Sequence, residues 1–384
     1  MSGADISRGG EARREFPLRL HRPLLELAHE YQPGVGAEPW RSDAAWSNSL
    51  RSRLRDLTLR LARRAGLTRR RYDPERAAER MGLLAERRDE LAEVYSLLAD
   101  ERSRGVLVDV LLMEVLGPWH VPTSISAQDF TARCRALERS HREDGEPIFS
   151  PYGHPLPLLR WPLAEGSLRI YAHPLQLVEF FDLEQYAYRQ VEPPVAASPG
   201  DVVLEAGGGW GDTALYFAAA VGAAGRVISV EFVEENLDLL RRNLETNPDL
   251  EPRVQVVPAA LWRDSGERLA FKPAGPASAL LPASGANAGA GEVETITIDD
   301  LRDQVGRPLD MVKLDVEGAE QQALAGAAAT LAEDRPKLAI AVYHSLDDLI
   351  EVPRRLAALE AVYELFLDHT VPGPHETILF ARPG

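Results

Sequence analysis

The sequence is poor in the residues and segments that would cross-link a protein or anchor it in a membrane. It holds a single cysteine, Cys134, among 384 residues, which excludes an internal disulfide framework and a zinc site built from cysteines. No run of about 18 apolar residues occurs, so we expect no transmembrane helix. The first residues also lack the apolar core of a secretory signal peptide. Together these absences predict a cytoplasmic protein.

Lysine is the second scarce residue. Three lysines stand beside 59 acidic residues, and arginine supplies the rest of the positive charge, a bias typical of GC-rich bacterial genomes. The net charge is −16, yet residues 1–90 hold 19 arginines and 14 acidic residues, so the acidic excess lies downstream. Because neutralisation of phosphates supplies much of the affinity for nucleic acid, we expect no nucleic-acid partner.

Helical patterns fill the N-terminal part of the chain. Leucines recur at helical spacing between 50 and 61, and further helices are predicted over about 75–99, 105–116 and 127–142. The arginines on these helices predict a solvated face, and contact with an anionic surface is the alternative. A homo-oligomer that forms through the same helices is also expected as a possible partner contact. The expected organisation is a disordered tail (1–15), an all-helical accessory domain (16–145), a proline-rich linker into the next domain (146–198) and a C-terminal domain (199–384).

Strands and helices alternate in the C-terminal domain, which predicts an α/β fold with a parallel sheet and right-handed crossovers. Two last strands joined by a tight turn predict an antiparallel pair at one edge. Residues 273–291, rich in Ala, Gly, Pro and Ser, predict a flexible surface loop that is either a lid or a tolerated insertion. Strands are predicted over 202–204, 227–230, 254–257, 311–314, 338–342, 363–369 and 375–381, and helices over 175–188, 213–220, 234–246, 319–331 and 346–359.

A glycine-rich turn follows the first of these strands, in the stretch VVLEAGGGWGDTALYFA. Glycine lets the backbone turn sharply and approach a ligand closely. The helix that begins with Asp212 and Thr213 offers free N–H groups to an anionic group of that ligand. The Gly-x-Gly-x-x-Gly spacing of dinucleotide-binding proteins is not met in either register. The pattern is instead acidic-x-Gly-x-Gly-x-Gly, formed by Glu205, Gly207, Gly209 and Gly211.

Acidic residues also follow two other strands. Glu231 ends RVISVEF, about twenty residues after the glycines, where a carboxylate can accept hydrogen bonds from both hydroxyls of a ribose. In DMVKLDVEGAE, Asp315 and Glu317 follow the strand predicted over 311–314. Glu320 lies either beside these two acids or at the start of the next helix, which it would cap. Such carboxylates can position a cofactor amine, take a proton from a hydroxyl or hold a divalent cation such as Mg²⁺.

One histidine is expected at the same edge of the sheet. His344 ends the strand in AVYHSLDD, and the carboxyl ends of parallel strands meet at one edge, where ligands bind in open α/β sheets. A catalytic and a structural role for His344 are both open. The candidate catalytic residues are therefore Asp315, Glu317 and His344.

The C-terminal half resembles the FkbM-type methyltransferase family. The resemblance lies in LEQYAYRQVEPP, the acidic glycine-rich stretch, VISVEFVEENLDLLRRNLETNP, TITIDDL, DMVKLDVEGAEQQALAGA, PKLAIAVYH and HETILFA, over about 168–381. Many members carry Asp-x-Gly-Ala-Asn where this chain has Glu205-Ala206-Gly207-Gly208-Gly209. The resemblance implies a Rossmann-like, seven-stranded methyltransferase sheet, mostly parallel, with an antiparallel last strand.

The resemblance also implies a function. The cofactor would be S-adenosyl-L-methionine, held by Glu205, Gly207, Gly209, Gly211, Asp212, Thr213 and Glu231, with Asp315 at the acidic position after the fourth strand. The substrate would be a small molecule such as a sugar, a glycan or a polyketide-type product, methylated on oxygen. Two other functions are weighed: an oxidoreductase with a nucleotide cofactor, and a non-catalytic scaffold that binds a partner or membrane surface through its arginine-rich helices.

Overall fold

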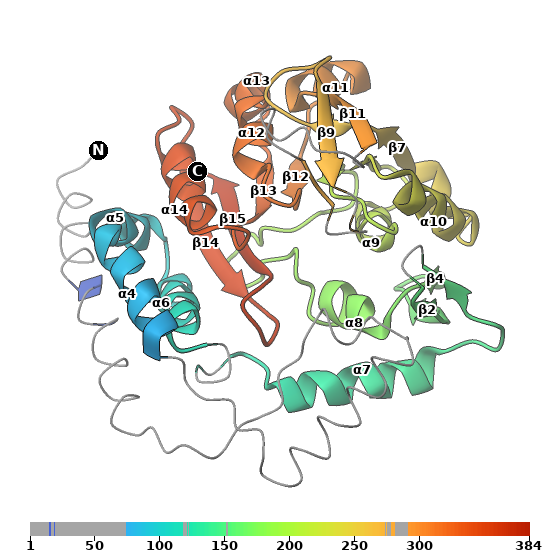
Figure 1. Ribbon diagram of the computed structural model, residues 1–384. Helices are drawn as coiled ribbons and strands as arrows, with labels where there is room; N and C mark the ends of the chain where they lie inside the picture. The colour runs from blue at the N-terminus through green and yellow to red at the C-terminus, as the bar shows by residue number, and fades with distance from the viewer. Residues whose placement is uncertain are drawn as a thin grey trace, which may run out of the picture. The chain divides into compact units, whose positions relative to one another are not determined.

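The computed structural model describes residues 15–16, 19, 74–117, 121, 123–150, 153–272, 274, 278–280 and 291–384. They form two compact units (Figure 1). One contains the described residues up to Ala132 together with His369–Glu376, and the other contains Arg133–Asp368 and Thr377–Gly384. The units thus divide at Ala132 and Arg133, upstream of the linker expected over 146–198. Within the described ranges, no helix is both long enough and apolar enough to cross a bilayer.

The described residues of the first unit include three consecutive helices. These are α4 (Pro74–Glu86), α5 (Arg88–Leu97) and α6 (Glu101–Leu116), so the helix predicted over 75–99 is interrupted at Arg87. Helix α6 begins earlier than predicted because the Asp100 carboxylate accepts a hydrogen bond from the Ser103 N–H (2.7 Å) and caps the helix. Helix α7 (Ala127–His141) matches the prediction. The predicted tail and the leucines between 50 and 61 lie outside the described residues, apart from residue 15.

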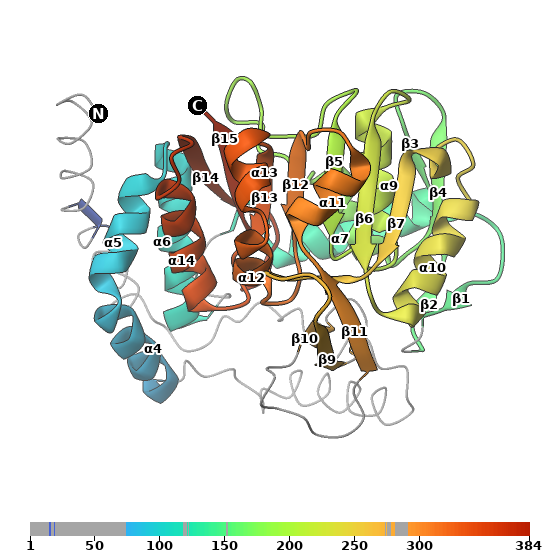
Figure 2. The ribbon, with the colours of Figure 1, turned by 90° about the horizontal axis from the view of Figure 1, so that it is seen from above.

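A seven-stranded sheet forms the centre of the second unit (Figure 2). Its order is β14-β15-β13-β12-β5-β6-β7, and all pairings from β13 to β7 are parallel, whereas β15 runs antiparallel to β13. This confirms the predicted sheet and its antiparallel last strand. The strands are β5 (Val202–Ala206), β6 (Arg226–Glu231), β7 (Val254–Pro258), β12 (Met311–Leu314), β13 (Lys337–Ala341), β14 (Tyr363–His369) and β15 (Thr377–Pro383).

The central strands are apolar runs because both faces of the sheet are covered. Every residue of β5 and β12 is buried, and α9 packs on β5 and β6. The helix predicted over 319–331 is two helices, broken near Gly326, where a side chain would meet the Trp262 carbonyl oxygen at 2.4 Å. The main helices are α9 (Asp212–Val221), α10 (Glu234–Glu245), α12 (Glu320–Ala325), α13 (Ala328–Glu333) and α14 (Leu346–Ala357).

Several small elements were not predicted. A second sheet of order β10-β9-β11-β8 lies between β7 and β12 in the chain, and most of the predicted loop 273–291 lies outside the described residues. The predicted helix 175–188 is short, because a π-helix, Val178–Asp182, ends it early. The elements that were not predicted are β1 (Ile148–Phe149), β2 (Pro155–Leu156), β3 (Leu158–Pro162), β8 (Ala260–Leu261), β9 (Arg268–Lys272), β10 (Ala279–Leu280), β11 (Gly291–Ile296) and α11 (Ile298–Val305). The other small elements are β4 (Ser167–Tyr171), where the stretch LRIYAHP predicts a short strand or loop, and α8 (Pro174–Leu177), which begins the predicted helix.

Two asparagines of α10 attach the β3–β4 hairpin to the sheet domain. The Asn243 amide accepts a hydrogen bond from the Tyr171 N–H (2.8 Å) and donates one to the Tyr171 carbonyl (3.1 Å). Asn247 makes the same pair of bonds to Arg169 (2.8 and 2.6 Å). Four helical residues rise about 6 Å and two strand residues about 6.6 Å, so side chains one turn apart match alternate residues of β4. Helix α10 thus bonds the backbone of β4 through its asparagine side chains, in the place where a neighbouring strand would otherwise pair with β4.

Replacing Asn243 is expected to loosen this attachment. Asn243→Ala removes both bonds to Tyr171 and a third to the Trp210 carbonyl (2.8 Å), and Asn243 is fully buried. Because each buried polar group left without a partner costs roughly 1–3 kcal/mol, we expect a loss of about 3 kcal/mol in the free energy of unfolding. Urea unfolding followed by circular dichroism measures it. Glu245→Gln, an exposed change on the same helix, is the control, and equal midpoints for both variants would contradict the assignment.

Candidate functional site

A cavity opens at the carboxyl ends of β5, β6 and β12. This is the edge at which ligands bind in open α/β sheets. Four residues predicted for the site line it: Gly207, Glu231, Asp315 and Glu317. The remaining lining residues are Ala206, Val230, Phe232, Ala259, Ala260, Leu261, Ser278, Leu280, Val316 and Ala319.

The glycine turn after β5 needs glycine for space as well as for conformation. Gly207 has φ +80°, and a Cβ there would lie 1.8 Å from the Asp315 carbonyl oxygen. A Cβ on Gly208 would lie 2.5 Å from the Ser229 hydroxyl. The N–H groups of both glycines donate to the Val230 carbonyl (3.1 Å each). The turn is therefore fixed between the ends of β6 and β12.

Glu205 lies beneath this turn and does not line the cavity. Its side chain is fully buried, and its oxygens accept hydrogen bonds from the hydroxyls of Thr213 (2.7 Å) and Ser229 (2.6 Å). The ammonium of Lys313, its register partner on β12, lies 3.4 Å away. A buried carboxylate requires such compensation. The prediction that this acidic side chain faces the cofactor is therefore corrected: Glu205 holds the turn, the helix and the two neighbouring strands together.

Glu231 is placed as predicted, at the tip of β6 beside the turn. Its carboxylate accepts hydrogen bonds from the N–H groups of Gly209 (2.9 Å), Phe232 (2.7 Å) and Val233 (2.8 Å). Burial raises the pKa of this carboxyl, and the three N–H groups act in the opposite direction. The side chain is oriented by the backbone and still reaches the cavity.

The side chain of Asp212 occupies the N-terminus of α9, where the sequence predicts free N–H groups for an anionic group of a ligand. Asp212 is buried, accepts the Thr213 N–H (2.9 Å) and bonds the side-chain amide of Gln176. Gly211 precedes it with φ +86°, and a Cβ there would lie 3.2 Å from the Leu240 Cα. Asp212, Thr213, Gly209 and Gly211 do not line the cavity, so they shape the site from behind.

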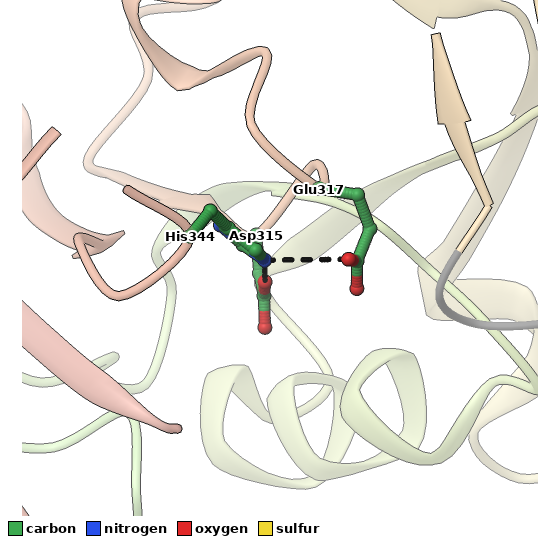
Figure 3. A group of neighbouring side chains, drawn as sticks. All are labelled: Asp315, Glu317 and His344. Carbon is green, nitrogen blue, oxygen red and sulfur yellow. Dashed lines mark ion pairs between the residues drawn. The ribbon is translucent and has the colours of Figure 1, made fainter. Parts of the chain in front are cut away.

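Asp315, Glu317 and His344 come together at the tips of β12 and β13 (Figure 3). The His344 Nε2 lies 3.6 Å from Asp315 Oδ1 and 3.4 Å from Glu317 Oε2, and its Nδ1 lies 3.1 Å from Glu320 Oε1. One ligand atom from each of Asp315, Glu317 and His344 lies within 4.8 Å of the others, close enough to hold a divalent cation. Glu317 has φ +56°, a left-handed conformation that is uncommon outside glycine and typical of functional sites.

The three carboxylates determine the charge of His344. Burial lowers the pKa of this imidazole, but Glu317, Glu320 and Asp315 together outweigh burial and raise it to about 11. The surrounding carboxylates therefore favour the protonated, positively charged form of the imidazole.

Three contributors to the site were missed in the sequence. Hydroxyls of Tyr186 and Tyr343 donate to Asp315 Oδ2 (2.8 Å) and Oδ1 (3.2 Å), and Lys313 donates to the carbonyls of Ala206 (2.9 Å) and Gly207 (3.0 Å). A lysine inside an apolar central strand is a signal that sequence reading could have used, since lysine is almost never fully buried without partners. Tyr186 lies in the stretch LEQYAYRQVEPP, which carries the family resemblance but does not indicate a contact with Asp315.

Asp212 predicts a pH dependence of stability. Burial, followed by the nearby Glu205, raises its pKa from 3.8 to about 7. The folded protein then holds this proton where the unfolded chain has released it, so Asp212 lowers stability as pH rises from about 4 to about 7. The free energy of unfolding of Asp212→Asn, relative to that of the wild type, should therefore be about 2–3 kcal/mol higher at pH 8 than at pH 5. This follows because one unit of pKa shift corresponds to about 1.4 kcal/mol.

Urea unfolding of both proteins at pH 5 and pH 8 measures this difference. The exposed Asp238→Asn is the matched control, since its carboxylate is 74% exposed, and it should show no such change. A difference between Asp212→Asn and wild type that is the same at both pH values would refute the assignment.

Comparison with known proteins gives one family match and several structural similarities. Residues 195–365 match the family model of the methyltransferase FkbM domain. No curated protein sequence matches the chain. Among solved structures, the chain is similar to methyltransferase FkbM from Methylobacillus flagellatus KT (18% identity, 87% of this chain and 71% of that chain, TM-score 0.49). Others are a Bacillus cereus O-methyltransferase in complex with SAH (16%, 72% and 97%, 0.32) and Aeropyrum pernix fibrillarin with bound S-adenosyl-L-methionine (13%, 63% and 97%, 0.34).

The matched residues contain β5, β6, β7, β12 and β13 of the central sheet, the glycine turn, Glu231 and the cluster of Asp315, Glu317 and His344. The segment 195–365 is therefore an FkbM-type methyltransferase domain.

Proposed function

We propose that the protein transfers a methyl group from S-adenosyl-L-methionine to a hydroxyl of a small molecule. The observation that carries this proposal is the Glu231 carboxylate, which three backbone N–H groups orient at the cavity edge beside the glycine turn. A carboxylate at that position suits the two hydroxyls of a ribose. The bound cofactor would supply an electrophilic methyl group on a sulfonium.

The rest of the cavity fits the other parts of this cofactor. Phe232, Leu261 and Leu280 line it next to Glu231 and offer an apolar wall to a purine base. Asp315 and Glu317 also line it and offer negative charge to the cationic amino group and sulfonium. The presence of apolar and acidic side chains in one wall supports a nucleoside with a cationic side chain over a dinucleotide with its anionic pyrophosphate.

The chain's own residues would mainly align the reactants. Correct alignment of two reactants is worth on the order of 7–11 kcal/mol of barrier in favourable cases. Asp315 already accepts two tyrosine hydroxyls, so it is better suited to hold a cationic group than to take a proton. Glu317 lines the cavity with its carboxylate 26% exposed, and we assign to it the uptake of the proton that the acceptor hydroxyl releases. His344 would hold both acids in place.

The acceptor is a small molecule, and the sugars, glycans and polyketide-type products implied by the family resemblance are the classes to test. A methyl-transfer assay of the purified protein against extract from its source, read by mass spectrometry as the gain of one methyl group, identifies it. The family assignment favours this activity over a non-catalytic scaffold, which would give no methylated product.

Replacing Glu231 should weaken binding of the cofactor product. Because hydrogen bonds to a charged acceptor contribute about 1.5–3 kcal/mol each, Glu231→Gln should raise the dissociation constant for S-adenosylhomocysteine about 10- to 100-fold. Isothermal titration calorimetry measures it, with Glu234→Gln, on the exposed first turn of α10, as the control. Tight binding of NAD without binding of S-adenosylhomocysteine would overturn the proposal in favour of an oxidoreductase.

Replacing Glu317 should affect the chemical step. Glu317→Gln is expected to lower kcat about 10²- to 10⁴-fold, the usual range for general-base catalysis, with little change in cofactor affinity. The activity of the wild type should survive EDTA. Loss of wild-type activity with EDTA and its recovery with Mg²⁺ would instead assign Asp315, Glu317 and His344 to a cation that activates the hydroxyl.

A further inference from the structure

Tyr186 lies outside the matched FkbM domain, yet its hydroxyl reaches the centre of the site. The residue is 1% exposed, and its hydroxyl donates to Asp315 Oδ2 at 2.8 Å. Asp315 lines the cavity with a side chain that is 14% exposed. The hydroxyl of Tyr186, which precedes the central sheet in the chain, therefore contacts Asp315, an acid that lines the cavity.

The ring of Tyr186 is fixed on several sides. The Lys313 ammonium lies 5.0 Å from its centroid, within the range of a cation–π contact. Phe180 of the π-helix stacks on the ring at 5.7 Å, and Phe217 of α9 lies 6.2 Å away. A ring held in this way has little freedom, so its hydroxyl donates from a set position.

The backbone around Tyr186 is equally constrained. The Ala187 N–H donates to the Glu184 carbonyl (2.8 Å) in a tight turn, and Glu184 has φ +48°. Tyr188 then pairs with Val195 through two backbone hydrogen bonds of 2.9 Å. These backbone contacts hold the segment before the domain in a conformation that places the Tyr186 side chain at the tip of β12.

We propose that Tyr186 is a positioning residue of the methyltransferase site. By donating to one oxygen of Asp315, it fixes the rotamer of this carboxylate so that its remaining lone pairs meet the cationic amino group of the cofactor. The Tyr343 hydroxyl donates to the other oxygen of Asp315 at 3.2 Å, so both oxygens of this carboxylate are held by hydrogen bonds. A carboxylate with both oxygens oriented in advance loses less conformational entropy when the ligand binds. This inference rests on the proposed function, since it assigns to Asp315 the cofactor's amino group.

The test compares two ligands with Tyr186→Phe, which removes one hydroxyl and keeps the ring over Lys313. S-adenosylhomocysteine carries the amino group, and 5′-methylthioadenosine lacks it. We expect the dissociation constant of the first to rise about tenfold, the size typical of a lost bond to a charged group, and that of the second to change less than about twofold. Tyr188→Phe is the control, because this buried tyrosine stacks on Phe366 (5.0 Å), away from Asp315.

The outcomes distinguish the positioning role of Tyr186 from the proposed function of the protein. An unchanged affinity for S-adenosylhomocysteine in a Tyr186→Phe protein with a wild-type melting temperature would refute the positioning role. Equal weakening of both ligands would do the same, because a merely structural role affects the whole cavity. Failure of the wild type to bind S-adenosylhomocysteine would refute the proposed function itself.

Discussion

The site depends on one buried ion pair, between Glu205 of β5 and Lys313 of β12. The two residues are register partners on adjacent parallel strands, with side-chain exposures of 0% and 2%. Their ionised groups are retained in the interior because each has further partners: two hydroxyls for the carboxylate, and two carbonyls and an aromatic ring for the ammonium. Those partners belong to the end of β5, the glycine turn, α9, β6 and Tyr186, so one pair links the turn to the strands and the helix around it.

This arrangement separates two kinds of acid. Glu205 and Asp212 are buried behind the glycine turn and organise it, whereas Glu231, Asp315 and Glu317 lie at strand tips and line the cavity. The difference follows from where each acid lies along its strand or turn. A residue inside a parallel strand projects into the helix layer, while a residue just beyond the strand's carboxyl end projects into the crevice. Acidic residues within one motif can therefore have different functions although their spacing looks uniform.

Negative charge is concentrated around His344 at the tips of β12 and β13. Asp315, Glu317 and Glu320 surround His344, and their negative charges favour a cation at this position, whether an imidazolium or a metal ion. Tyr186 and Tyr343 add two donors to Asp315. An acid held by neutral hydroxyls and one nearby cation remains available to a positively charged ligand. The same surroundings would disfavour an anionic group, which agrees with the proposed sulfonium cofactor.

The sequence by itself determined the α/β class, the parallel sheet, the glycine turn, and the strand-tip positions of Glu231, Asp315, Glu317 and His344. These follow from periodicity, glycine spacing and chain position, all of which are local. It failed for Glu205, whose role depends on neighbours from β6, β12 and α9, and for Lys313 and Tyr186, whose partners are remote in the chain. The small second sheet and the asparagine attachment of β4 were missed for the same reason. Tertiary structure alone decided these features, because burial and hydrogen-bond partners are properties of residues brought together by folding, not of neighbours in sequence.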